Sequence, residues 1–149
     1  MLPAWCDNRV PVFDFELQGE TPSNNVIKGM HYRSYRTLRR QWQLKVFCEG
    51  LKGRRPAQCV ARTALVIDRY CAGELDWDNA YGGLKPLLDC LVAPSKQNPD
   101  GLGLILNDNP TAMPFPPLLY QLRAPRGEGR TRIRIFDLDA AILMVAIQP

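Results

Sequence analysis

The residues best suited to chemistry are three aspartates, Asp76, Asp78 and Asp108. Asp76 and Asp78 are two positions apart, and on an extended segment such side chains point the same way. A divalent cation removes the repulsion between two carboxylates, whose oxygens are ligands that Mg²⁺ and Mn²⁺ prefer. If the short strand before Asp108 lies beside the strand before Asp76, all three acids reach one sheet edge. That arrangement predicts a metal-dependent phosphodiester-hydrolysis site.

The same residues have a simpler structural explanation. An Asp-Trp-Asp-Asn sequence at 76–79, placed after a strand, is also typical of a turn and a helix N-cap. No phosphate-cradling glycine loop and no Cys/His or Ser/His arrangement competes with the acids, which disfavours a small-molecule enzyme. The single histidine, His31, has no nearby Cys or His partner, so we expect a hydrogen-bonded structural side chain and no zinc site.

Charge is unevenly distributed along the chain. The formal net charge is only +4, but residues 28–62 contain ten Lys or Arg and one acid. Residues 68–108 contain seven acids and three bases, and residues 123–134 contain five Arg and one Glu. Two basic blocks around an acidic block suit a protein that grips a polyanion around a cation-binding centre. Ordinary solvated surface charge is the alternative.

Length and composition predict one globular domain. The chain has 149 residues, of which 46% are hydrophobic and 23% charged. No apolar run reaches the roughly 18 residues of a membrane span, and no secretory signal is visible. The five cysteines form no C-x-x-C pair, so we expect reduced cysteines in a cytoplasmic protein.

Hydrophobic periodicity predicts an α/β (α+β) domain, with a mixed sheet of about five strands and two main helices. The expected strands are residues 12–17, 59–70, 102–106, 118–122 and 130–138, the last two joined by a hairpin-like turn at 125–129. The expected helices are residues 30–51 and 79–92. The second helix either begins at Lys85, with Pro86 in its first turn, or follows a short capped turn and a joint at Gly82 and Gly83.

The first helix has two apolar stripes. One consists of Leu44, Phe47, Cys48 and Leu51, and the other of Tyr35, Leu38, Trp42 and Val46. The second stripe is expected to face either more core or a partner subunit. The apolar tail at 140–147, expected as a last strand or short helix, is the other candidate interface.

Several ordered motifs resemble the RusA-type Holliday junction resolvases. They are Pro22-Ser-Asn-Asn25, Met30-His-Tyr32, Leu75-Asp-Trp-Asp-Asn79, Leu84-Lys-Pro-Leu-Leu-Asp-Cys-Leu91, Gly103-Leu-Ile-Leu-Asn-Asp108 and Gly129-Arg-Thr-Arg-Ile-Arg-Ile135. The resemblance runs from about residue 13 to residue 135. Asn107 stands where that family carries an acid, and Lys85 follows Asp78 by seven residues where the best-known spacing is four.

The resemblance implies a RusA-like fold and a homodimeric, Mg²⁺-dependent crossover junction endodeoxyribonuclease of phage or prophage type. It assigns metal binding to Asp76, Asp78 and Asp108, catalysis to Lys85 and a supporting role to Asp89. An i,i+4 ion pair between Lys85 and Asp89 is the simpler interpretation of that lysine. A nuclease acting on other branched DNA and a binding module without activity remain alternatives.

Within this hypothesis, arginines on two elements hold DNA phosphates. Arg33, Arg36, Arg39 and Arg40 lie on the expected first helix, with Tyr32 and Tyr35 interleaved for base stacking or, for Tyr35, core packing. Arg130, Arg132 and Arg134 alternate along the last strand and so share one face. A half-exposed strand at a sheet edge shows the same alternation.

Overall fold

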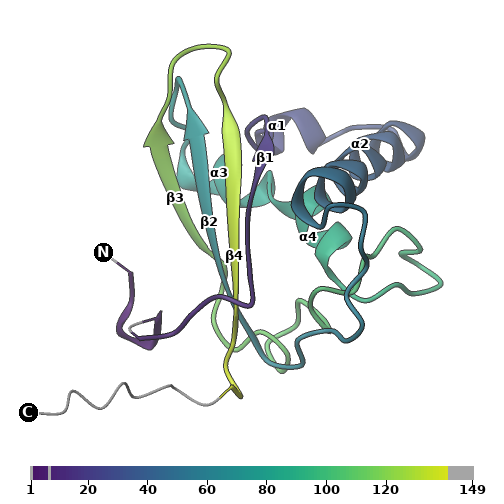
Figure 1. Cartoon of the computed structure of the whole chain (residues 1–149). Helices are drawn as coiled ribbons and strands as arrows, with labels where there is room; N and C mark the ends of the chain where they lie inside the picture. The colour runs from purple at the N-terminus through teal and green to yellow at the C-terminus, as the bar shows by residue number, and fades with distance from the viewer. Residues whose placement is uncertain (1, 7, 141–149) are drawn as a thin grey trace, which may run out of the picture.

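Four strands form one mixed sheet in the order β1-β4-β2-β3, and the computed structural model describes residues 2–6 and 8–140 (Figure 1). The strands are β1 (Phe13–Gln18), β2 (Thr63–Cys71), β3 (Leu118–Arg123) and β4 (Arg130–Asp137). β4 is antiparallel to β1 and β2, whereas β3 is parallel to β2. The chain is therefore an α+β domain with a mixed sheet, as predicted, but with four strands.

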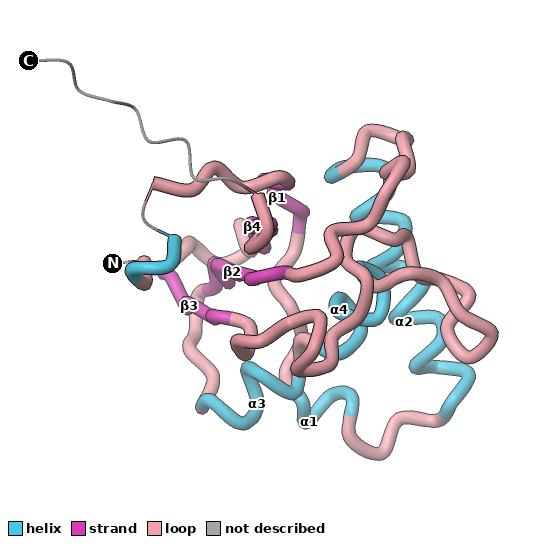
Figure 2. The backbone as a smooth tube through the Cα atoms, turned by 90° about the horizontal axis from the view of Figure 1, so that it is seen from below, coloured by secondary structure: helices cyan, strands magenta, loops and turns pink. Residues whose placement is uncertain are grey.

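The helices are α1 (Asn24–Ile27), α2 (Tyr32–Lys45), α3 (Trp77–Gly82) and α4 (Lys85–Leu91). A π-helical turn over Val46–Gly50 continues α2, and a 3-10 turn covers Ala4–Cys6. With its continuation α2 spans 19 residues, and α3 with α4 spans 15. Figure 2 shows α2 and α4 on the side of the sheet away from the N-terminal segment.

Alternation along the strands builds a separate apolar cluster on each face of the sheet. Leu65 and Ile67 of β2 pack with the helices, whereas Ala64 and Val66 pack with Cys6 and its neighbours on the other face. This alternation follows from the extended strand, in which successive side chains point to opposite faces. Because both faces are covered, nearly the whole strand is buried.

The predicted strand at 102–106 is wrong. Only Ile105 makes β-bridges there, to Val60 and Val92. Gly103 has a φ of 76°, and a Cβ at Gly101 would lie 2.5 Å from the Val92 carbonyl oxygen, so the chain turns and packs closely instead of extending. The two neighbours of β2 are β4 and β3, so this segment does not pair with β2 itself.

The hairpin predicted at 125–129 is also wrong. β3 and β4 do not pair, because β2 lies between them in the sheet. The connection therefore crosses over the end of β2. It still contains a tight turn, in which the Glu128 amide bonds to the Pro125 carbonyl and Gly127 has a φ of 85°.

The second apolar stripe of α2 faces the core, which is one of the two alternatives predicted for it. Trp42 and Val46 are buried in the core with Leu38 packed against them, so this stripe is core and not a free interface. On the other stripe Phe47 and Leu51 also reach the core, but Leu44 is 52% exposed. The predicted interface at 140–147 lies, beyond Ala140, outside the described residues.

Within the described part of the chain, no helix combines the length and apolar character needed to cross a membrane. All five cysteines are free; Cys6, Cys71 and Cys90 are buried and Cys48 is exposed.

Candidate functional site

The two motifs at Pro22–Asn25 and Asp76–Asn79 meet at one corner of the molecule. The Asn79 side-chain oxygen accepts hydrogen bonds from the Asn25 amide at 3.2 Å and from the Ser23 hydroxyl at 3.3 Å. Ser23 also caps α1 through the same Asn25 amide. The Asn79 side chain therefore joins the two segments, which lie 54 residues apart in sequence.

The close approach of these two segments requires glycine at positions 82 and 83. A Cβ on Gly82 would lie 2.4 Å from the Asn24 side chain, and a Cβ on Gly83 would lie 1.7 Å from the Pro22 carbonyl oxygen. A larger residue at either position would push the two segments apart. The structure thus confirms the predicted joint, with α3 before it and α4, which has Pro at its start, after it.

Arg69 on β2 stabilises the same corner through hydrogen bonds to two backbone carbonyls. This residue was not identified from the sequence. Its side chain is buried, and its Nε donates to the Thr21 carbonyl at 2.9 Å while Nη1 donates to the Gly73 carbonyl at 3.4 Å. Thr21 and Gly73 lead into the two motifs. The available signal was a cation inside an apolar strand, which must satisfy its donors locally.

Gln121 on β3 fixes the chain just before Asp76. Its amide group donates to the Leu75 carbonyl at 2.8 Å and accepts from the Leu75 amide at 2.9 Å. These two hydrogen bonds resemble the backbone pairing of a further strand beside β3. It places Leu75 beside Gln121, at the level of Arg69 on β2.

Asp76 and Asp78 are both exposed at the N-terminal turn of α3. Asp76 is the N-cap, and its Oδ1 accepts from the Asn79 amide at 3.2 Å. The segment is therefore not extended as the metal-site argument assumed, because the helix begins at Trp77. The N-cap interpretation is confirmed, and both carboxylates also favour the positive end of the helix.

Asp108 lies at the opposite end of β2. The Leu106 amide bonds to the Val60 carbonyl and the Thr63 amide bonds to the Ala112 carbonyl, so Asp108 lies where β2 begins. Thr63 and Arg69 are six residues apart, or about 20 Å at about 3.3 Å per residue. The expectation that Asp108 reaches the same edge is wrong, because the segment before it runs beside Val60 and not beside the end of β2.

One chain consequently does not gather the three predicted acids. Among residues 2–6 and 8–140, no three His, Cys, Asp or Glu side chains are grouped so as to hold a metal ion. Asp76 and Asp78 remain as a pair on one turn. Two carboxylates are what Mg²⁺ often takes from a protein when substrate phosphate and water complete its shell, so this pair fits that ion.

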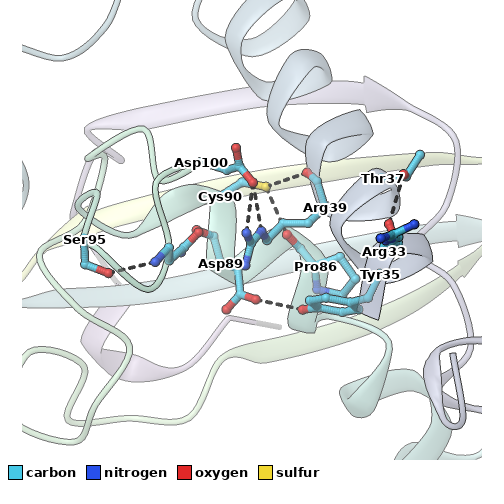
Figure 3. Close-up of polar contacts among 10 residues, drawn as sticks. Arg33, Tyr35, Thr37, Arg39, Pro86, Asp89, Cys90, Ser95 and Asp100 are labelled. Atoms are coloured by element: carbon cyan, nitrogen blue, oxygen red, sulfur yellow. Dashed lines mark hydrogen bonds and ion pairs between the residues drawn. The ribbon is translucent and has the colours of Figure 1, made fainter. Parts of the chain in front are cut away.

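Lys85 and Asp89 form the i,i+4 ion pair, at 2.5 Å between Nζ and Oδ1. The other carboxylate oxygen of Asp89 accepts from the Tyr35 hydroxyl at 2.7 Å (Figure 3). Tyr35 comes from α2, so the sequence alone did not indicate this contact. Lys85 itself is more than half exposed, whereas the Asp89 side chain is nearly buried.

Three of the four helix arginines form an exposed group, which we call the α2 arginine face: Arg33, Arg36 and Arg40. They line, with Thr37 and Asp100, an open hollow of about 320 Å³. Within the described residues none of the three makes an ion pair, and Arg36 lies over the Tyr32 ring at 5.7 Å. Three free guanidinium groups around one hollow suit an anion such as a phosphate.

Arg39 does not belong to that face. It is 7% exposed, and its guanidinium pairs with Asp100 at 3.0 Å (Figure 3). It therefore anchors the loop that follows α4 to α2. Its predicted phosphate contact is not available in this arrangement.

The strand arginines, which we call the β4 arginine row, are all partnered: Arg130, Arg132 and Arg134. Arg132 makes two 2.8 Å bonds to Asp14, and Arg134 bonds both oxygens of the buried Asp68. Arg130 lies 3.6 Å from Glu16 and stacks on the Tyr70 ring at 3.8 Å. The hydrogen bond from Arg132 holds the pKa of Asp14 below its usual range.

His31 is the N-cap of α2, and its Nδ1 accepts from the Arg33 amide at 3.2 Å. This confirms the expected structural hydrogen bond.

In comparisons with known proteins, no family model and no curated protein matches the sequence.

Proposed function

We propose that this chain is a metal-dependent endodeoxyribonuclease that resolves four-way (Holliday) DNA junctions by paired phosphodiester hydrolysis. The observation that carries the proposal is the corner held by Asn79, where two motifs of the RusA-type pattern meet although they are far apart in sequence. The protein would act in the cytoplasm of a bacterial or phage-infected cell.

The α2 arginine face supports a DNA substrate. Its free guanidinium groups offer charge-assisted contacts to backbone phosphates, which dominate the affinity of DNA-binding proteins. Lys85 is exposed at the start of α4, close to the α3–α4 joint. In the proposal it stabilises charge on the scissile phosphate.

Asp76 and Asp78 would hold the metal ion, Mg²⁺ or Mn²⁺. A bound divalent cation supplies Lewis-acid stabilisation of phosphate oxygens and lowers the pKa of coordinated water. Asp76 also remains the cap of α3, so its second oxygen is the one free to face an ion. Asn79, Arg69 and Gln121 hold the turn that carries both acids.

The proposed enzyme is a homodimer, because two symmetric nicks in a two-fold junction require two sites. Asp108 lies at the other end of β2 within one chain, so any metal contact that it makes in the proposed dimer is to the acidic centre of the partner copy. Mixing the Asp76→Asn and Asp108→Asn proteins tests this assignment. Activity returns in the mixture if the site is shared between copies, and a mixture as inactive as its parts contradicts sharing.

A nicking assay tests the function. Wild type, Asp76→Asn and the exposed-acid control Glu128→Gln are incubated with a synthetic four-way junction or a matched linear duplex, with Mg²⁺ or with EDTA. We expect paired nicks in the junction alone, lost with EDTA and in Asp76→Asn but kept in Glu128→Gln. Cleavage that survives EDTA, or nicks in the duplex at the same rate, would contradict the proposal.

A non-catalytic or differently specific branched-DNA-binding protein is the second candidate. It is favoured by the separation of Asp108 from Asp76 and Asp78 within the described chain. The same assay distinguishes it. Tight binding of the junction without cleavage in Mg²⁺ or Mn²⁺ supports the binding protein, and cleavage of flapped DNA in preference to junctions supports altered specificity.

A further inference from the structure

Tyr35 connects α2 to the exposed lysine of α4 through one carboxylate. Its hydroxyl donates to Oδ2 of Asp89 at 2.7 Å, and Oδ1 of Asp89 accepts from the Lys85 ammonium. The Asp89 side chain is 12% exposed and that of Lys85 57% exposed. A nearly buried carboxylate thus joins a partly buried tyrosine to a cation at the surface.

The stability of α4 does not explain why a lysine stands at position 85. Lys85 is the first residue of α4, at the positive end of the helix dipole, where a cation is unfavourable. The pair also has the basic residue before the acidic one, the weaker of the two i,i+4 orders. Local electrostatics therefore argue against this placement, which points to a role outside the helix.

The Tyr35 hydroxyl stays protonated at neutral pH and so remains a hydrogen-bond donor to Asp89. Burial raises the pKa of Tyr35 well above its usual range, and the hydrogen bond and charge of Asp89 raise it further. The neighbouring thiol of Cys90 is neutral as well, since burial raises its pKa to about 12. The backbone of Asp89 is tied in turn, because the Asn98 side chain donates to its carbonyl. Asp89 is consequently held in one orientation.

We propose that Tyr35 is a positioning residue, which holds Asp89 so that Asp89 holds the Lys85 ammonium at a fixed place beside the α3–α4 joint. The inference rests on the proposed function, in which Lys85 meets the phosphate being cut. Without Tyr35, the Asp89 carboxylate can rotate, and the long lysine side chain follows it into solvent. The alternative is that the bond only joins α2 to α4.

The test compares Tyr35→Phe with Tyr70→Phe, which removes a hydroxyl from the opposite face of the sheet while keeping the ring over Arg130. Lysine-ammonium ¹H–¹⁵N NMR without DNA reports on Lys85, with its signal assigned from Lys85→Arg. We expect a folded Tyr35→Phe protein whose Lys85 signal broadens or disappears, and an unchanged signal in Tyr70→Phe. The single-turnover rate constant of junction nicking should fall about 10-fold in Tyr35→Phe alone, while the affinity for the junction stays unchanged.

Each outcome decides the matter. An unchanged Lys85 signal and nicking rate in Tyr35→Phe overturn positioning and leave the proposed function intact. If the Lys85 signal is lost in Tyr35→Phe but the wild-type protein cuts no DNA, the link from Tyr35 to Lys85 stands and its catalytic purpose is removed. If Tyr35→Phe does not fold, Asp89→Asn takes its place, because it weakens the hold on Lys85 while it still accepts from Tyr35. A fixed Lys85 signal in that variant overturns the inference.

Discussion

The α2 arginine face and the β4 arginine row contain three arginines each, and in the sequence both have the spacing of a phosphate track. On α2 the guanidinium groups surround an open hollow and make no ion pair within the described residues. On β4 every member is bound by an acid of a neighbouring strand, Asp14, Glu16 or Asp68. The difference arises from what faces each arginine and not from the spacing.

The surroundings of the two elements explain this. α2 contains no acidic residue from Tyr32 to Lys45, so its exposed arginines have no i,i+4 partner. β4 lies between β1 and β2, whose acids alternate onto the same face. Partnered arginines would have to give up existing bonds to reach a phosphate. We therefore expect DNA to contact α2 and the β4 row to stabilise the sheet.

The largest effect is expected from Arg134, the most buried member of the β4 row. Arg134→Met leaves the carboxylate of Asp68 buried without a partner, which should lower the free energy of unfolding by about 3 kcal/mol. Urea denaturation measures the change. The double variant with Asp68→Leu should recover most of the loss, and a single variant as stable as wild type would show that the row is not structural.

The α2 arginine face should dominate DNA affinity. Replacing Arg33, Arg36 and Arg40 together with alanine should weaken junction binding about 100-fold. The negative slope of log affinity against log salt concentration should become shallower by about 3. Fluorescence anisotropy over a salt series measures both. The control replaces three exposed arginines elsewhere, Arg54, Arg55 and Arg126, and so removes the same charge. Equal losses in the two triple variants would mean that only net charge matters.

Arg132 offers a smaller test of the row. Its pair with Asp14 is about one-third exposed on each side, so Arg132→Gln should cost less than about 1 kcal/mol of stability. Junction affinity should change by less than about 2-fold, because the guanidinium is already bound. A loss of affinity as large as that of a single α2 substitution would place the row in the DNA interface.

The smallest effect is the pH dependence of the same pair. Since Arg132 lowers the pKa of Asp14 in the folded state, the pair stabilises the protein above the unfolded value of about 3.9 and is lost as the pH falls through the lower folded value. Asp14→Asn should differ from wild type by a fraction of 1 kcal/mol at pH 6, and the difference should vanish once the pH lies below the lowered folded value. A difference that persists in acid would contradict this account.

The sequence predicted the element types well because periodicity reports burial directly. The strand predicted over 59–70 is present as β2, and the glycine joint lies before α4. It did not predict that β2 would separate β3 from β4, because the pairing order depends on contacts between distant segments. The placement of Asp108 failed for the same reason, since the pairing at Ile105 sets which end of β2 that loop reaches.

For the candidate site, the sequence indicated the residues with local roles, but not Arg69, Gln121 or the contacts between distant segments. The N-cap at Asp76 and the pair of Lys85 with Asp89 follow from local spacing, and both are confirmed. Tyr35 lies 54 residues from Asp89, and Arg69 braces segments on both sides of itself. Such contacts depend on how α2 packs against α4 and on how the loops close over the end of β2.

Cleavage of a plasmid that extrudes a cruciform tests the proposed function most directly. A supercoiled plasmid with one cruciform is incubated with the wild-type chain and Mg²⁺, and the products are separated on a gel. We predict linear molecules, produced by two nicks across the junction within one binding event, and no product from Asp76→Asn or from a plasmid without the cruciform. Binding to the cruciform with no linear or nicked product in Mg²⁺ or Mn²⁺ would contradict the proposal.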